Sequence, residues 1–153
     1  MDDDIRARVE IADLQARYGD AVTRRAWDEL PALFLPDCPV RLDLRGTVVE
    51  HVGGAAIGSF IAGSIERFEF FEFALLNAVV DLGPGPDEAT GRLYMWELRQ
   101  DAEGHRWSNA YGLYRDRYER HDGRWVFARR DYSSLARTAP GSDGMEVFEV
   151  PGR

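Results

Sequence analysis

Two tyrosines and two aspartates are the side chains of this sequence best suited to acid–base chemistry. Tyr18 and Tyr94 each carry a hydroxyl that can donate a hydrogen bond to a substrate carbonyl. Asp20 and Asp131 each carry a carboxylate that can remove a proton if burial raises its pKa toward neutrality. No spacing in the sequence forces these four residues together, so their candidate catalytic roles depend on the fold.

Other chemistries find less support in the sequence. The histidines, His51, His105 and His121, do not have the spacing of metal ligands, and Cys38 is the only cysteine. The glycine pairs lack the strand–turn–helix context of a phosphate-binding loop, and no serine lies in a nucleophile elbow. We therefore expect no metal site and no cofactor.

Helices at the beginning of the chain must position Tyr18 and Asp20. Apolar residues recur at spacings of three and four, which predicts a helix over 4–23. A second helix is predicted to begin near Asp28, with Pro31 in its first turn, where the missing N–H is tolerated. The residues predicted to be buried in these two helices are Ile11, Leu14, Tyr18, Ala21, Val22, Trp27, Leu30, Leu33 and Phe34.

Alternating sequences predict strands over most of the remaining chain. Short strands over 40–45 and 47–52 precede a third helix after Gly53-Gly54, and long strands follow over 71–82, 89–100, 106–120 and 124–132. Consecutive hairpins make a meander, and the helices ahead of it must cover one face. The predicted fold class is therefore α+β, a cone-shaped roll with a curved, mostly antiparallel sheet wrapped over N-terminal helices.

This fold predicts one domain over residues 1–135 and a C-terminal tail over 136–153. The tail is either loose or docked as a short strand through Val147, Phe148 and Val150. Inside the cone, alternating aromatic residues either form plain core or line a pocket for a flat, mostly apolar ligand. The candidate pocket residues are Val22, Thr23, Leu44, Phe60, Phe73, Asn77, Tyr94, Trp96, Asn109 and Tyr111.

Several motifs along the chain carry a family resemblance. They are Arg17, Tyr18, Ala21, Trp27, Leu30, Leu33 and Phe34 in the opening block, FLPD over 34–37, Asn77, and the ending DGRWVFARR over 122–130. Together they resemble the SnoaL-like family of the nuclear transport factor 2 superfamily over about residues 6–134. The resemblance implies a pocket bounded by the first helix, the third helix and the sheet. In dehydratases and dehydrochlorinases of this family, an Asp–His dyad in that pocket abstracts a proton.

The resemblance places Thr23 at the aspartate position of the dyad and Phe73 at the histidine position. Threonine carries no charge to orient an imidazole, and phenylalanine cannot accept a proton. What is implied is a protein that binds a small apolar polycyclic or aromatic molecule. It is either a lyase, isomerase or cyclase that works without the dyad, or a non-catalytic binding or scaffold module of the same fold.

The composition of the chain limits the kinds of partner that it is expected to bind. The chain has 153 residues and a net charge of −8, which suits one globular domain and argues against binding to a nucleic acid backbone. No apolar run approaches the ~20 residues that cross a bilayer, and the acidic start has no signal-peptide core, so no membrane association and a cytoplasmic location are expected. Exposed aromatic residues on a sheet, together with the family resemblance, imply a homodimer or homotrimer.

Overall fold

The elements follow the predicted order with one exception among the helices. The computed structural model describes residues 2–152. Its helices are α1 (Asp3–Arg24) and α2 (Gly53–Ile65), with two 3-10 turns, η1 (Trp27–Glu29) and η2 (Pro31–Leu33), between them in the chain. Its strands are β1 (Pro39–Asp43), β2 (Val48–Val52), β3 (Phe68–Leu82), β4 (Glu88–Asp101), β5 (Trp107–His121), β6 (Arg124–Thr138) and β7 (Met145–Val147).

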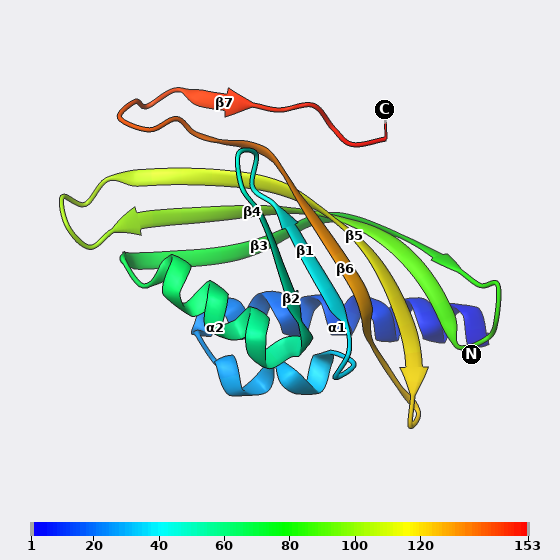
Figure 1. Ribbon diagram of the computed structural model, residues 1–153. Coiled ribbons are helices and arrows are strands. Elements are labelled where there is room, and N and C mark those ends of the chain that lie inside the picture. Colours follow the sequence, from blue (N-terminus) through cyan, green and yellow to red (C-terminus); the bar gives the residue numbers. More distant parts are fainter. Residues whose placement is uncertain (1, 153) are drawn as a thin grey trace.

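One curved sheet wraps around α1, as Figure 1 shows. The strand order is β2-β1-β6-β5-β4-β3, and β7 pairs with β6 outside this path. The pairing of β1 with β6 is parallel, and the hairpins of the meander are antiparallel. The sheet bends over α1, with α2 and the 3-10 turns on the same side. The predicted α+β roll is confirmed.

Helix α1 is confirmed with ends within one residue of the prediction. The Asp2 side chain accepts a hydrogen bond from the Asp4 N–H at its start, and Arg25 ends it with φ of 59°. All five apolar residues predicted on its buried face are at most 4% exposed. Each large side chain buried in this way contributes roughly 1.5–3 kcal/mol. The helix is therefore held against the sheet by one apolar stripe.

The predicted second helix is wrong. The chain forms η1 and η2 instead, each only three residues long, and Asp28 lies within η1 rather than capping a helix. Pro31 has no N–H to donate to the Trp27 carbonyl, so a continuous α-helix cannot pass through it, and it begins η2. Leu30 and Phe34 are nevertheless buried as predicted, because the two turns present them to the core.

The long strands carry irregularities that the sequence did not predict. Register shifts occur between Leu75 and Ala78 where β3 pairs with β4, and at two places where β5 pairs with β6. Such a bulge changes which face the following side chains occupy. On β6 this puts Phe127 and Arg130 both in the interior, although alternation predicts opposite faces for them.

The last strand continues to Thr138, past residue 135. After a turn, β7 pairs with β6, with Ala136 opposite Val147 and Thr138 opposite Met145. The Phe148 N–H then donates to the Leu135 carbonyl. In Figure 1 this segment, in orange and red, lies at the top of the view, far from α1. Of the two alternatives for the tail, a loose segment or a docked short strand, the structure therefore has the docked strand.

Two glycines allow close approaches that shape the interior. A Cβ on Gly112 of β5 would lie 2.1 Å from Cε2 of Tyr132 on β6, so only glycine lets that ring lie across the strand. A Cβ on Gly19 would lie 3.0 Å from Cδ1 of Phe73, so α1 sits close to β3.

No helix among residues 2–152 is long and apolar enough to cross a membrane.

Candidate functional site

A cavity of about 230 Å³ lies between α1, α2 and the inner face of the sheet. Its apolar lining residues are Val22, Leu42, Leu44, Phe60, Ile61, Ile65, Phe68, Phe73 and Ala110. Its polar lining residues are Tyr18, Ser64, Arg67, Glu97, Arg99, Tyr114, Tyr132, Ser134 and Arg137. An apolar enclosure with a few convergent polar groups is the usual form of a small-molecule site.

Two larger hollows, of about 940 and 570 Å³, lie on the outside of the molecule. The larger follows α1, where Asp13 pairs with Arg17 and Asp20 pairs with Arg24. These charges are exposed and already neutralise one another, so this groove offers little to a ligand. The smaller inner cavity is the candidate functional site.

Some predicted pocket residues meet at this cavity. Val22, Leu44, Phe60 and Phe73 all line it, and so does the catalytic candidate Tyr18. Thr23 lies beside them without lining the cavity. Its Oγ1 accepts a hydrogen bond of 2.9 Å from the Phe73 N–H, so the residue ties the end of α1 to β3.

Four predicted pocket residues lie on the opposite face of the sheet: Tyr94, Trp96, Asn109 and Tyr111. Trp96 stacks on Tyr111 and donates from Nε1 to Asn109 Oδ1 at 2.9 Å. The reason is the two-residue period of a strand: Leu93 and Met95 are buried in the core, so their neighbours on β4 point outward. Tyr94 therefore has no access to the cavity as a hydrogen-bond donor.

Asn77 and the two aspartate candidates also lie outside the cavity. Asn77 is exposed and falls within the register shift of β3. Asp20 is exposed and paired with Arg24, which lowers its pKa through a hydrogen bond. Asp131 accepts a 2.8 Å hydrogen bond from Arg129 and lies opposite Arg41 on the outer face. Neither aspartate is placed to act on a ligand in the cavity.

Glu97 is the carboxylate that the structure does place in the cavity. It lies on β4 in phase with buried Leu93 and Met95, and its side chain is 22% exposed. Desolvation raises its pKa above the ordinary 4.5, and the nearby Arg99, 3.2 Å from Oε2, opposes that rise only in part. The sequence contained one indication of this position: Glu97 follows the apolar residues Leu93 and Met95 at two-residue intervals, so all three are expected on the same face of the strand.

Three tyrosines line the same cavity as Glu97. Tyr18 and Tyr114 lie with their hydroxyl oxygens 3.5 Å apart. Burial raises the pKa of both, and it also raises the pKa of Tyr132, on which the Glu97 charge acts. All three hydroxyls are therefore protonated at neutral pH and can donate hydrogen bonds. The cavity thus combines one poised carboxylate with neutral donors.

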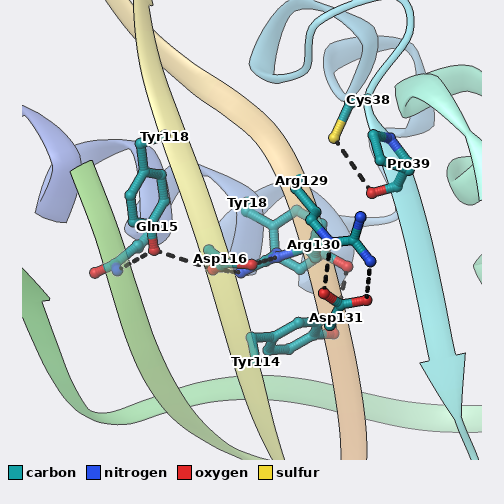
Figure 2. A network of polar contacts seen from close by, with 10 residues as sticks. All are labelled: Gln15, Tyr18, Cys38, Pro39, Tyr114, Asp116, Tyr118, Arg129, Arg130 and Asp131. Atoms are coloured by element: carbon teal, nitrogen blue, oxygen red, sulfur yellow. Dashed lines mark hydrogen bonds and ion pairs between the residues drawn. The ribbon is translucent and has the colours of Figure 1, made fainter. Parts of the chain in front are cut away.

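A buried ion pair between Arg130 and Asp116 lies next to two of these tyrosines, Tyr18 and Tyr114, as Figure 2 shows. Arg130 donates from Nε and Nη2 to the two carboxylate oxygens of Asp116 at 2.8 and 2.9 Å, and both side chains are fully buried. The Arg130 guanidinium carbon lies 3.8 Å from the ring centre of Tyr114 and 4.3 Å from that of Tyr18. The guanidinium therefore fixes the two rings that carry cavity hydroxyls.

The network continues away from the cavity. The Tyr118 hydroxyl donates to Asp116 at 3.0 Å and accepts a 2.8 Å hydrogen bond from the Gln15 amide on α1. Burial by itself lowers the pKa of Arg130, but the Asp116 carboxylate more than offsets this, so the guanidinium stays charged. This chain of contacts links α1, β5 and β6, and it gives the Asp116 carboxylate and the Nε and Nη2 groups of Arg130 hydrogen-bond partners. Nη1 of Arg130 is buried without a hydrogen-bond partner among residues 2–152.

The remaining titratable residues give no second site. His105 and His121 are exposed beside Glu69 and Glu119, and His51 packs on Phe60. Cys38 is buried, which raises the pKa of its thiol to about 12. Over residues 2–152, no three His, Cys, Asp or Glu side chains cluster in a way that could hold a metal ion.

The raised pKa of Glu97 predicts a pH dependence of stability. The native protein keeps the proton at pH values where the unfolded chain has lost it, so this stability is present below pH 4.5 and is lost as pH rises through the raised pKa. Glu97→Gln should therefore gain in melting temperature relative to the wild type as pH rises through that window. Glu103→Gln, in an exposed turn, is the control and should show no such trend. A difference independent of pH would contradict the raised pKa.

The chain therefore folds as an α+β roll with a half-open cavity between its helices and the inner face of the sheet. The SnoaL-like domain model matches residues 3–131, and the chain belongs to this family. The predicted family is confirmed. No curated protein matches the sequence of this chain.

Solved structures share the fold at low sequence identity. A proposed scytalone dehydratase from Novosphingobium aromaticivorans has 20% identity and a TM-score of 0.78, with 99% of this chain and 97% of that chain covered. LinA has 22% identity and a TM-score of 0.76, with 97% of each chain covered. Hexachlorocyclohexane dehydrochlorinase LinA-type3 from Novosphingobium barchaimii has 20% identity and a TM-score of 0.75, covering 97% of this chain and 98% of that one. These likenesses concern the fold.

Proposed function

We propose that this protein is a lyase, isomerase or cyclase that transfers a proton at carbon in a small apolar molecule, without an Asp–His dyad. Glu97 is the general base, and the hydroxyls of Tyr132 and the Tyr18–Tyr114 pair donate to the substrate carbonyl. The observation that carries the proposal is a desolvated carboxylate of raised pKa in an apolar cavity that also holds neutral hydroxyl donors.

The chemistry follows from the pKa of each group. A base with a raised pKa holds an abstracted proton more firmly, which makes removal of a proton from carbon less unfavourable. Electron density then accumulates on the substrate oxygen, and neutral tyrosine hydroxyls stabilise that charge by hydrogen bonding. Arg99 keeps enough of Glu97 ionised for the first step, because its guanidinium lies 3.2 Å from the carboxylate.

The volume of the cavity limits the size of the expected polycyclic or aromatic ligand. Its volume of about 230 Å³ lies below the range of roughly 300–1,000 Å³ typical of drug-sized ligands. A molecule with one or two fused rings suits it better than a four-ring compound. The names of the structural neighbours, a dehydratase and a dehydrochlorinase, support elimination as the reaction class.

The test is hydrogen exchange at carbon, which does not require the natural substrate. 2-Tetralone, an enolisable bicyclic ketone, is incubated with the protein in D2O, and loss of its α-proton signals is followed by NMR. We expect exchange above the buffer rate, with a rate that rises with pH through the raised pKa of Glu97 and a midpoint above 4.5. Tyr94→Phe, on the outer face, is the control and should exchange like the wild type.

The alternative function is ligand binding without turnover. Thr23 and Phe73 favour it, because the side chains at the usual dyad positions form a structural hydrogen bond and an apolar wall. A raised melting temperature with 2-tetralone, together with exchange no faster than in buffer, would support this alternative and contradict catalysis.

We also propose that the protein assembles as a homodimer or homotrimer in the cytoplasm. Apolar side chains are exposed on the sheet, including Phe70 and Trp107, which contact each other with ring centres 5.6 Å apart. A second copy that covers such side chains would remove them from water.

A further inference from the structure

One transverse row of the sheet brings a second charged group to the cavity wall. Glu97 on β4 pairs with Ala110 on β5, and Ala110 pairs in turn with Arg137 on β6. All three residues line the cavity. Ala110 is small, so its side chain does not project between the two charged groups. Because neighbouring strands lie about 4.8 Å apart, the Glu97 and Arg137 backbones are separated by roughly 10 Å.

Contacts from the C-terminal segment and from the turn between β1 and β2 hold Arg137 at this wall. Its Nε donates to Glu146 Oε2 at 3.0 Å, Nη1 donates to the Leu44 carbonyl at 2.7 Å, and Nη2 donates to the Arg45 carbonyl at 3.3 Å. The guanidinium also lies 5.1 Å from the ring centre of Phe148. These contacts fix the planar group before any ligand arrives, which lowers the cost of binding one.

The hydrogen-bonding capacity of Arg137 is not used up by these contacts. A guanidinium has five N–H groups, and the three hydrogen bonds leave one N–H on each terminal nitrogen, counted over residues 2–152. Its ion pair is with Glu146, whose side chain is 41% exposed, so solvent screens that attraction. Arg137 can therefore accept a second carboxylate.

The other two arginines at the cavity are less available. Arg99 lies against Glu97 and also donates to Ser108, so an anion bound there would repel the proposed base. The Arg67 side chain is 70% exposed and lies 3.7 Å from Asp101. Arg137 differs because Ala110 separates it from Glu97, so a ligand can present an anion at one end and a reacting carbon at the other.

We infer that the ligand of this cavity carries a carboxylate that Arg137 binds, at the end of the molecule away from the carbon that faces Glu97. The placement of the reacting carbon beside Glu97 rests on the proposed function. The placement of the ligand carboxylate rests on Arg137 alone. The substrate class is thus a one- or two-ring ketone acid rather than a neutral hydrocarbon-like compound.

The test compares two ligands of equal size and different charge, the 6-carboxylic acid of 2-tetralone and its 6-carboxamide, by isothermal titration calorimetry at pH 7.5. The wild type should bind the acid about 10- to 100-fold more tightly, the range expected for charge-assisted hydrogen bonds. Arg137→Gln should remove this preference, while Arg106→Gln, in the exposed β4–β5 turn, should keep it. Glu146→Gln should strengthen acid binding, because it removes the competing carboxylate.

Each outcome bears on one of the two proposals. Equal affinity for acid and amide, no binding of the acid, or a preference that survives Arg137→Gln would overturn the inference. Exchange of 2-tetralone without any preference for the acid would leave catalysis standing and refute acid recognition. Preference for the acid without exchange of either probe would support acid recognition and refute catalysis. Circular dichroism of each variant checks that the fold is kept.

Discussion

Asp116→Ala should lower the free energy of unfolding by about 3–5 kcal/mol, the cost typical of removing one partner of a buried ion pair. The change leaves the Arg130 guanidinium charged and buried among the rings of Tyr18, Tyr114 and Phe127, without the carboxylate that accepts its two hydrogen bonds. The Tyr118 hydroxyl loses its acceptor as well. Urea unfolding followed by circular dichroism measures the effect.

A matched control separates burial from the mere loss of an ion pair. Asp13→Ala removes the partner of Arg17 on the exposed side of α1, where both side chains are more than half exposed. That change should cost less than about 1 kcal/mol, as exposed pairs do. Similar losses for Asp13→Ala and Asp116→Ala would contradict the role assigned to the buried pair. Replacing both Asp116 and Arg130 with apolar residues should recover part of the loss, because no buried charge then remains.

Glu97→Gln should reduce the rate of α-proton exchange by about 10²- to 10⁴-fold, the contribution typical of a positioned general base. Glutamine is similar in size and can still lie beside Arg99, but it cannot accept the proton. The affinity for 2-tetralone should therefore change little while the exchange rate falls. The rise of the wild-type rate with pH should disappear in the variant.

Asp131→Asn is the matched control for this second result. Asp131 is the carboxylate on β6 that the sequence offered as a base, and the structure pairs it with Arg129 on the outer face. Its replacement should leave the exchange rate near that of the wild type. If Asp131→Asn abolished exchange and Glu97→Gln did not, the base would have been assigned to the wrong face of the sheet.

Helical periodicity alone was sufficient to predict the buried face of α1. The apolar positions from Ile11 to Val22 form one stripe, and a stripe of that width has to face the core whatever covers it. Turn signals such as Asp122-Gly123 likewise predicted the hairpin that joins β5 and β6. The motifs spread along the chain were sufficient for the family, because they reflect the fold rather than one reaction.

The face of each long strand was harder to predict. Alternation shows which residues share a face but not which face is inside, and both faces of β4 and β5 carry aromatic or apolar side chains. Trp96 and Tyr111 resemble pocket residues by type, yet it is the neighbouring pair, Glu97 and Ala110, that faces inward. The register shifts on β5 and β6 then change the alternation partway along the strand, so Arg130 pairs with Asp116 across the sheet rather than with its neighbour Asp131.

The sequence by itself was sufficient to predict an α+β roll with helices under a curved sheet, because local periodicity and turn chemistry are properties of short segments, and its motifs were sufficient to predict the SnoaL-like family. Only the tertiary structure decided which carboxylate meets an apolar cavity and which arginine stands opposite it. Glu97 and Arg137 come together through hydrogen-bonded pairing across three strands, and burial then raises the pKa of the carboxyl. Pairing register and desolvation exist only in the folded chain, so the chemistry of the site does as well.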